Sequence, residues 1–252
     1  MKLGYQLYSA RNFPPLSDVF ARLSKAGYSA VEGYGALYER LDAAELDAFR
    51  TDLDRNGLTM PTAHFGIDLL EQEPQRVLTL AEKLGIEAIY CPFIGADNRP
   101  VNSKGWEAFG ERLAAAAKPY TDKGLVFGWH NHAFEFEKTP EGDIPLDLIF
   151  KGGPDLAWEA DIAWVVRGGA DVDDALARHG ARIKAVHVKD LAPSGEAEDE
   201  GGWADVGFGT IGWSELLPKL KQLGVVHFII EHDNPNDLER NVSRSITSVS
   251  SY

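Results

Sequence analysis

Short hydrophobic runs alternate along the chain with longer stretches in which apolar residues recur every three or four positions. The runs are typical of buried strands, and the periodic stretches are typical of amphipathic helices. The runs predict strands at Lys2–Tyr8, Ser29–Gly33, Leu58–His64, Ala88–Phe93, Gly124–Phe136, Leu156–Asp161, Ile183–Val188 and Val226–Glu231. The periodic stretches predict helices at Leu16–Ala26, Ala43–Asn56, Pro74–Leu84, Ser103–Lys123, Ile144–Phe150, Val172–His179, Trp213–Leu223 and Asn236–Val249.

Each predicted strand is followed by a predicted helix, which gives eight strand–helix units in 252 residues. Strands that alternate with helices pair in parallel. Eight such units predict an α/β fold of the (β/α)8 TIM barrel type, in which sites lie at the carboxyl ends of the strands. A doubly wound open sheet is the competing architecture. Because no linker or break in composition interrupts the chain, we expect a single domain over residues 1–252.

Polar side chains with metal-binding atoms lie at or near the ends of most predicted strands. They are Glu32, His64, His130, His132, Glu135, Asp161, His187 and Glu231. Because the carboxyl ends of parallel strands meet at one face of a barrel, we expect these side chains to converge there. Carboxylates and imidazoles without a thiolate suit a divalent ion such as Mn²⁺, Mg²⁺, Co²⁺ or Zn²⁺.

Some of these residues have a second interpretation. Asp161 could cap the following helix, but we favour a metal ligand because it ends an apolar strand. Strand alternation lets only one of Glu231 and His232 face the barrel interior, and we expect Glu231 there. His187 on its own would be a core histidine. Lys189 shares its strand face, where it could neutralise a substrate oxyanion or balance the carboxylates, and a surface lysine is the alternative.

Composition excludes several classes of function. The net charge of −14 argues against a nucleic-acid partner, because phosphate binding needs a basic surface. No apolar run has the length of a membrane-spanning helix and the first residues do not form a secretory signal, so we expect a cytoplasmic protein. Cys91 is the single cysteine, and its apolar neighbours indicate a buried structural thiol.

Two further stretches bear on the site. Gly207–Gly212 matches the G-x-G-x-x-G pattern of dinucleotide-binding proteins, but no buried strand precedes it. We therefore expect a glycine-rich bend whose backbone lies close to a ligand. The acidic stretch Leu191–Gly202 follows the predicted seventh strand, and its position predicts a mobile lid over the site.

Five motifs together resemble those of a known family. They are HNHxxEF at 130–136, Glu-x-Asp-x-x-Trp at 159–164, His-Val-Lys-Asp at 187–190, Val-Gly-x-Gly at 206–209 and Glu-His-Asp-Asn-Pro at 231–235. They resemble the xylose isomerase-like sugar phosphate isomerase/epimerase family of the AP endonuclease 2 superfamily. The resemblance extends over essentially the whole chain.

The resemblance implies a barrel that binds one divalent ion, most often Mn²⁺, through residues of the fifth to eighth strands. The implied ligands are Glu135, Asp161, His187 and Glu231, with His130 as the alternative to Glu135. Many relatives carry a glutamate where this chain has His130. The substrate contacts would come from Glu32, His64, His130, His132 and Lys189.

The leading functional hypothesis is a sugar isomerase or epimerase that acts through an enediolate or a hydride shift on a small-molecule sugar. Glu135 and Glu231 would move the protons from opposite faces. Elimination or hydration of a 3-keto sugar uses the same carbanion and is an alternative. An abasic-site endonuclease and a sugar-binding barrel without turnover are further alternatives. Barrels of this kind often associate, so a homo-oligomer is compatible with the resemblance.

Overall fold

Eight parallel strands close into a barrel in the computed structural model, which describes residues 3–39 and 41–252. The strands are β1 (Leu3–Gln6), β2 (Ala30–Gly33), β3 (Thr59–His64), β4 (Ala88–Cys91), β5 (Val126–His130), β6 (Ala157–Asp161), β7 (Ile183–Val188) and β10 (His227–Ile230). Strand β1 pairs with both β2 and β10, and this pairing closes the sheet. The predicted TIM barrel is therefore confirmed.

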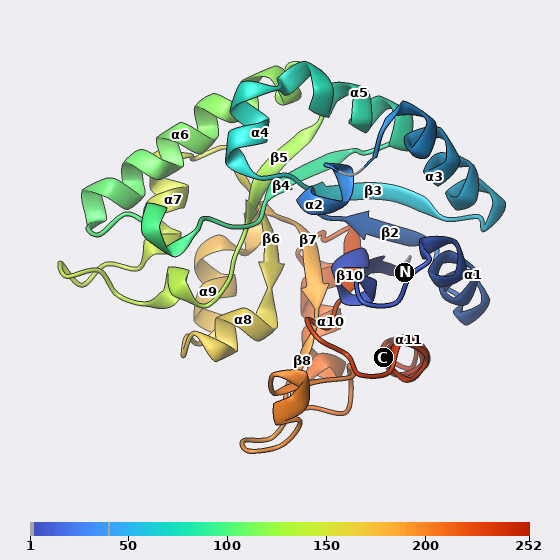
Figure 1. The fold of residues 1–252 in the computed structure, drawn as a ribbon. Helices are drawn as coiled ribbons and strands as arrows, with labels where there is room; N and C mark the ends of the chain where they lie inside the picture. Colours follow the sequence, from blue (N-terminus) through green and yellow to red (C-terminus); the bar gives the residue numbers. More distant parts are fainter. Residues whose placement is uncertain (1–2, 40) are drawn as a thin grey trace.

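Helices surround the barrel on its outside (Figure 1). They are α1 (Leu16–Ala26), α2 (Gly35–Tyr38), α3 (Ala43–Arg55), α4 (Ile67–Gln72), α5 (Pro74–Leu84), α6 (Ser103–Thr121), α7 (Pro145–Gly152), α8 (Ile162–Arg167), α9 (Val172–His179), α10 (Trp213–Gln222) and α11 (Leu238–Ser250). The last helix returns to the first, where the Tyr28 hydroxyl donates to the Val242 carbonyl and Arg22 pairs with Glu239. Within the described ranges, no helix combines the length and apolarity needed to cross a bilayer.

Apolar side chains fill two layers of the molecule. The main core lies between the strands and the helices and contains large buried rings such as Trp129, Trp158 and Trp213. A smaller apolar cluster contains Tyr90, Ala157 and Ala185 and is separate from this core. The strand positions two residues beyond Ala157 and Ala185 carry charged or imidazole side chains, because successive side chains of a strand alternate between its two faces. The apolar cluster therefore lies in the barrel interior, below the polar residues at the strand ends.

The elements differ from the predictions mainly at their ends. Lys2 lies outside the described residues, and the first strand ends at Gln6, before a short 3₁₀ helix at Leu7–Ala10. The predicted strand Gly124–Phe136 is wrong beyond His130, where the chain turns and forms a 3₁₀ helix at Phe134–Phe136. The cap of α6 is Asn102, whose side chain accepts from the Gly105 N–H group.

The stretch after β7 forms a small hairpin beyond the barrel. Strands β8 (Asp190–Leu191) and β9 (Trp203–Ala204) pair antiparallel. The hairpin projects away from the closed sheet at the lower edge of Figure 1. The predicted lid over residues 191–202 is thus a folded hairpin in this structure, and its mobility stays a prediction.

Candidate active site at the carboxyl ends of the strands

Strand register brings the polar residues of three neighbouring strands together. His130 of β5 lies beside Glu159 of β6, and Asp161 lies beside His187 of β7. Glu159 and Asp161 are two residues apart, so both side chains lie on the interior face of the barrel. Glu159 consequently lies one layer below Asp161. The interior therefore holds two levels of ionisable groups.

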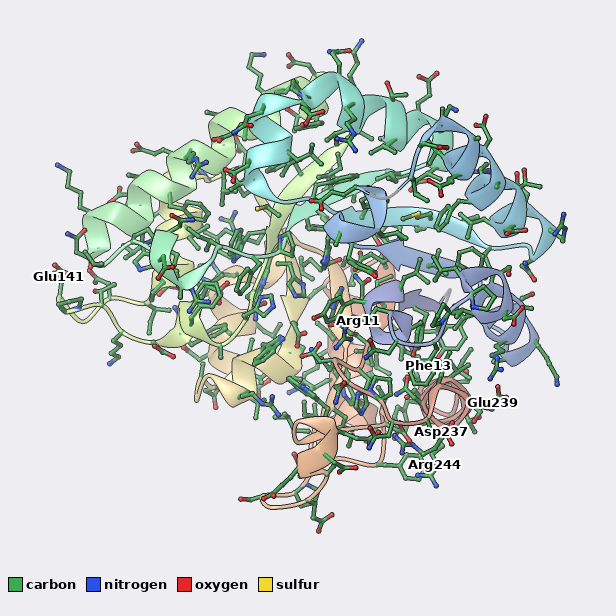
Figure 2. The ribbon with its side chains drawn as sticks, in the orientation of Figure 1. Arg11, Phe13, Glu141, Asp237, Glu239 and Arg244 are labelled. Atoms are coloured by element: carbon green, nitrogen blue, oxygen red, sulfur yellow. The ribbon has the colours of Figure 1, made fainter. Side chains whose placement is uncertain are left out.

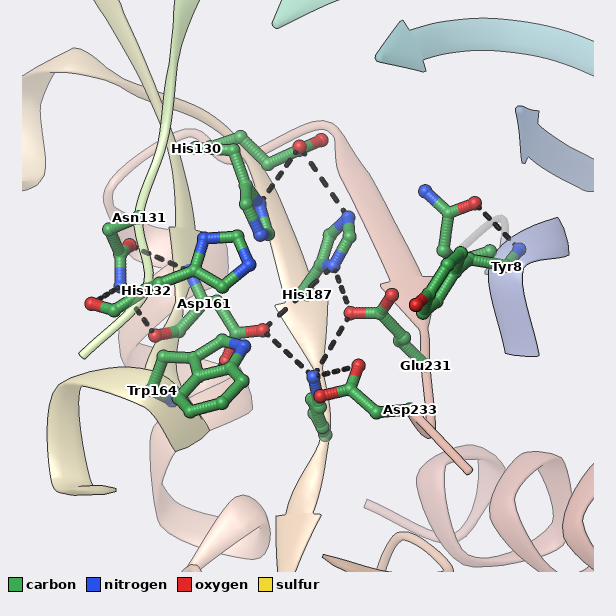
Figure 3. Close-up of polar contacts among 12 residues, drawn as sticks. Tyr8, His130, Asn131, His132, Asp161, Trp164, His187, Glu231 and Asp233 are labelled. Atoms are coloured by element: carbon green, nitrogen blue, oxygen red, sulfur yellow. Dashed lines mark hydrogen bonds and ion pairs between the residues drawn. The ribbon is translucent and has the colours of Figure 1, made fainter. Parts of the chain in front are cut away.

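The upper level is a group of three residues that we call the mouth group: Asp161, His187 and Glu231. One ligand atom from each lies within 4.8 Å of the others. His187 Nδ1 is 2.7 Å from Glu231 Oε2 and 4.0 Å from Asp161 Oδ2 (Figure 3). Asp161 Oδ1 accepts from the Trp164 N–H group and so caps α8, while Asp161 Oδ2 is buried and has no hydrogen-bond partner. The capping interpretation of Asp161 is therefore confirmed for one oxygen, and its role as a metal ligand, for which the other oxygen is available, stays a prediction.

Lys189 places an ammonium group beside the mouth group. Its Nζ atom lies 3.4 Å from Glu231 Oε2 and 3.7 Å from Asp161 Oδ2, and it donates a short hydrogen bond to Asp233 Oδ1. The rings of Trp164 and Trp203 cover the same nitrogen at 5.0 and 4.0 Å from their centroids. Lys189 is fully buried, so this cation is held by carboxylates and aromatic faces alone.

The lower level is a second group, the inner group, and it contains Glu32, His64, His130 and Glu159. His64 Nε2 hydrogen-bonds Glu159 Oε2 and lies 3.1 Å from Glu32 Oε1. His187 belongs to both levels, because its Nε2 atom is 2.7 Å from Glu32 Oε1 while its Nδ1 atom faces Glu231. Three buried polar atoms of this group have no hydrogen-bond partner. They are Glu32 Oε2, His130 Nδ1 and Glu159 Oε1.

Burial and nearby charges raise the pKa of some of these groups and lower the pKa of others. Burial and the neighbouring Glu32 carboxylate raise the pKa of Glu159 to about 7. Burial favours the neutral form of His64, but the carboxylates of Glu32 and Glu159 outweigh it and raise its pKa to about 10. Burial and the nearby His187 hold the pKa of His130 well below its usual value, so His130 is a neutral imidazole. The protein thus keeps charged and neutral imidazoles side by side.

In the mouth group, burial and neighbouring charges also compete in setting the pKa values. Burial raises the pKa of Asp161 to about 6, against the opposing charge of Lys189. Burial would also raise the pKa of Glu231, but Lys189 and His187 hold it well below the usual range. Glu231 is therefore an anion at neutral pH, which is the state that a cation needs.

Glu135, a predicted ligand and catalytic residue, lies outside both groups. Its carboxylate accepts from the Trp129 Nε1–H group at 2.9 Å and from the His132 N–H group at 2.9 Å. Burial raises its pKa to about 8. Because the chain turns after His130, the side chain of Glu135 returns toward β5 and does not enter the mouth. The structure instead places His130, the predicted alternative, at the interior face of the fifth strand.

The remaining predicted residues lie where the strand pattern put them. Glu231 faces the interior, whereas the backbone N–H group of His232 donates to Ser9 Oγ on the other side. His132 is half-buried above the mouth, where its ring packs near Trp164 and Phe93. Asn131 Oδ1 accepts from the Asp161 N–H group at 3.0 Å and so ties β5 to β6.

A pocket of about 570 Å³ opens above these groups. Its polar lining includes His64, His130, His132, Glu231 and Asp233, and its apolar walls include the rings of Tyr8, Tyr34, Phe93 and Trp164. Arg11, labelled near the middle of Figure 2, lines the same pocket and donates to the backbone carbonyls of Tyr8 and Asp233. Among the lining residues in the described part of the chain, it is the single guanidinium or ammonium group.

The glycine-rich segment Gly207–Gly212 wraps around a carboxylate of the same chain. Asp190 accepts hydrogen bonds from the backbone N–H groups of Leu191, Gly207, Gly209 and Ile211, at 2.9 to 3.3 Å. A Cβ atom on Gly209 would lie 2.3 Å from the Asp190 carboxylate. The bend predicted from the sequence is therefore present, and the group that it approaches is Asp190.

Sequence reasoning missed Glu159 and Asp233 as members of the site. Glu159 stands two positions before Asp161, so strand alternation alone gives it the same face. Asp233 likewise stands two positions after Glu231, although β10 has ended there and the alternation no longer applies strictly. Trp164, which covers Lys189, offered a weaker signal because it lies on α8, a helix of six residues that the hydrophobic pattern did not predict.

A closed parallel barrel with carboxylates and imidazoles at the carboxyl ends of its strands defines the class of this protein. Within that class, the chain belongs to the xylose isomerase-like TIM barrel family, whose model matches residues 20–251. No curated protein matches the chain.

Solved structures of similar fold cover nearly the whole chain. A sugar phosphate isomerase/epimerase from Parabacteroides distasonis ATCC 8503 is 19% identical, with a TM-score of 0.81 over 98% of this chain and 92% of that one. The probable 3-DHS dehydratase AsbF involved in petrobactin synthesis, from Bacillus anthracis, is 13% identical, with a TM-score of 0.77 over 99% of each chain. The IOLI protein with a binding zinc atom is 16% identical, with a TM-score of 0.76 over 100% and 99%. At these identities the likeness establishes the fold alone.

Proposed function

We propose that the protein is a divalent-metal-dependent sugar isomerase or epimerase. The observation that supports this most directly is the mouth group, in which two carboxylates and one imidazole lie within 4.8 Å of one another and Glu231 lines the pocket. Membership of the xylose isomerase-like family, among whose structural neighbours one is called a sugar phosphate isomerase/epimerase, supports the same class of reaction.

The donor set of the mouth group fits a divalent ion. Asp161 Oδ2 is buried without a partner, and Glu231 is held in its anionic form. Two carboxylates, one imidazole and the oxygens of a sugar form an oxygen-rich set, which suits Mn²⁺ or Mg²⁺ better than a softer ion. We therefore propose Mn²⁺ with Asp161, His187 and Glu231 as its ligands. When bound, the ion would polarise adjacent carbonyl and hydroxyl oxygens of the substrate.

Glu231 would transfer the proton in the reaction, and Lys189 would offset the negative charge that develops. Glu231 lines the pocket as an anion and would remove the proton beside the keto group. Lys189 holds a positive charge 3.4 Å from Glu231, where it would offset the negative charge that develops on the substrate oxygen. Asp233 accepts from Lys189 and lines the same pocket, so it is the second carboxylate from which a proton could be returned.

The pocket walls favour a sugar without a phosphate group. Rings of Tyr8, Tyr34, Phe93 and Trp164 offer flat apolar faces to the C–H bonds of a sugar, while His64, His130 and His132 offer polar atoms to its hydroxyls. Arg11 is the one strong cation of the lining in the described residues, and its guanidinium is engaged by two backbone carbonyls. The predicted contacts with Glu32 and Lys189 would be indirect, because both side chains are fully buried.

Solvent isotope exchange tests the proposal. The metal-free chain is reconstituted with Mn²⁺ and incubated in D₂O with a panel of unphosphorylated ketoses, and NMR follows both the sugar and its deuterium content. We expect a new isomer or epimer that carries deuterium at the carbon beside the keto group. A new sugar without deuterium would overturn the enediolate route in favour of a hydride shift. Loss of water from the sugar would identify a dehydratase, and no turnover across the panel would overturn the proposal.

A further inference from the structure

The interior of the barrel contains more metal-binding atoms than one ion at the mouth can use. We propose that a second divalent cation binds one layer below the mouth, between His64, His130 and Glu159, and that the imidazole of His187 is shared by both sites. This inner site depends on neither the identity of the sugar nor the reaction proposed above.

Two pairs of ligand atoms of the inner site have the spacing of a coordination shell, and a third pair, His64 and Glu159, is in direct hydrogen-bond contact and would have to separate. His64, His130, Glu159 and His187 each offer one atom, and these atoms all lie within 4.8 Å of one another. Glu159 Oε2 is 3.2 Å from His130 Nδ1 and 3.5 Å from His187 Nε2. Ligands at about 2.0 to 2.2 Å from a tetrahedral ion are roughly 3.3 Å apart. Two of the measured distances therefore match this spacing before any ion is added.

Unpartnered atoms point to the same place. His130 is 2% exposed, and its Nδ1 atom has no hydrogen-bond partner although it lies near Glu159. Glu159 is fully buried, and its Oε1 atom is also unpartnered. A buried polar atom without a partner costs about 1 to 3 kcal/mol, and such atoms are few in folded proteins. Coordination would give the free nitrogen of His130 the partner that the protein alone does not supply.

His187 has the geometry of a bridging ligand. Its Nδ1 atom faces the mouth group and its Nε2 atom faces the inner group, with Glu231 and Glu32 respectively at 2.7 Å. The ring is stacked on His64 at a centroid distance of 5.3 Å and an interplanar angle of 10°. A neutral imidazole offers a lone pair on one nitrogen only, so His187 would bridge two ions as an imidazolate, with its remaining ring proton released to solvent. Its two nitrogens are turned to the two levels here.

The two sites would select different ions. The inner site offers three imidazoles and one carboxylate, a nitrogen-rich set that suits Zn²⁺ or Co²⁺. The mouth site offers two carboxylates and shares its only imidazole, so it suits Mn²⁺ or Mg²⁺. The charge also balances, because Glu32 and Glu159 together carry two negative charges beside one divalent ion, and the bridging imidazolate of His187 shares its single negative charge between both ions. In the absence of an ion, protons on His64 and His187 would provide the same balance, so the metal content distinguishes the two arrangements.

Counting bound ions tests the proposal. The full chain, with any affinity tag removed, is stripped with a chelator and dialysed against Zn²⁺, and elemental analysis gives the ions per chain. We expect two in the wild type and one in both Glu159→Gln and His130→Gln. The variant Asp161→Asn should also hold one, because it keeps the inner site. Glu196→Gln changes an exposed glutamate of the hairpin and should hold two.

Cobalt distinguishes the sites by their coordination. Co²⁺ should give strong visible absorption in the wild type and in Asp161→Asn, since the nitrogen-rich inner site is four-coordinate, and weak absorption in Glu159→Gln. Circular dichroism establishes whether each variant is folded. If a variant does not fold, the number of ions bound per wild-type chain alone decides between one site and two. One ion in the wild type that Glu159→Gln retains would overturn the inner site and leave the proposed function standing. Two ions without deuterium exchange or turnover would overturn the proposed function and leave the inner site standing.

Discussion

The protein contains two buried ionic clusters, and they differ in how completely their polar atoms are paired. Inside the barrel, the mouth and inner groups leave several carboxylate and imidazole atoms without partners. Between the segment after β7 and α11, Asp205 accepts from both Arg240 and Asn241, and Glu200 accepts from Arg240 and from the Asn236 N–H group. No side-chain atom of this second cluster, which we call the clasp, is left buried and unpaired among the described residues.

The difference indicates what each cluster is for. A fully paired network joins parts of the chain, and the clasp joins the hairpin after β7 to α11. An incompletely paired network keeps its atoms available for something that the chain does not supply, such as a cation or a substrate. Burial and charge alone would not separate the two clusters, because Asp205 and Asp161 are both buried.

The largest expected effect is the loss of activity in Asp161→Asn. Asparagine keeps the oxygen that caps α8 but loses the anionic charge beside the proposed ion. We expect kcat/KM to fall roughly 10³-fold, because a Lewis-acid ion contributes several kcal/mol to the transition state. The free energy of unfolding should stay within about 1 kcal/mol of the wild type. Asp97→Asn changes an exposed aspartate and is the control; equal activity in both variants would remove the mouth group from the reaction.

The next effect is on stability and concerns Asp205→Ala in the clasp. Removing this carboxylate leaves Arg240 and Asn241 partly unpaired. We expect the free energy of unfolding to fall by about 3 kcal/mol, as when one partner of a buried ion pair is removed. Urea denaturation measures the change. Bound metal per folded chain should be unchanged, and a loss of metal at full stability would contradict the distinction between the clusters.

Glu135 extends the comparison to a carboxylate that is near the mouth but fully paired. Its pKa in the folded protein is about 8, above that of an exposed glutamate, so the folded state binds a proton that the unfolded state releases at lower pH. Its stabilising contribution is complete below about pH 4.5 and is lost as the pH rises to 8. The unfolding free energy of Glu135→Gln, relative to that of the wild type, should therefore increase from pH 5 to pH 9.

Two readouts check this prediction. Urea denaturation at each pH gives the shift, with Glu196→Gln, which changes an exposed glutamate, as the control. Metal binding by Glu135→Gln should equal that of the wild type, because the Glu135 carboxylate is engaged by Trp129 and the His132 backbone. Loss of one bound ion would instead support the ligand role expected from the sequence.

The smallest effect is in the reactivity of Cys91, which reports how often the core opens. The thiol is fully buried, and burial raises its pKa to about 12, so it should not react with a thiol reagent at pH 8 in the folded wild type. Labelling should be faster in Asp205→Ala, which populates open states, and unchanged in Asp161→Asn. Equal acceleration in both variants would show that the mouth group also stabilises the fold.

Much of the fold could be predicted from the sequence because short apolar runs and periodic stretches alternate in a regular order. The pattern located residues at or next to the carboxyl ends of the strands, such as His64, Asp161, His187 and Glu231. It missed α2, α4 and α8, because helices of four to six residues are too short to show a period.

The chemistry of the site was harder to predict where the strand geometry ends. Glu135 looked like a fifth-strand ligand, but the turn after His130 changes the direction of every later side chain, and no periodicity describes that turn. The pairing of individual atoms is also invisible in a sequence. Whether an oxygen of Asp161 is free or that of Asp205 is bound depends on residues that are far away in the chain.

The loop around Asp190 explains how a G-x-G-x-x-G motif can be present in a chain without forming a nucleotide-binding site. Its backbone amides form a cradle of the kind that holds phosphate in other proteins, and here the chain inserts its own anion. A mononucleotide would have to displace a tethered aspartate that is present at a very high local concentration. The glycine-rich segment is thus anchored internally by Asp190, the residue next to Lys189.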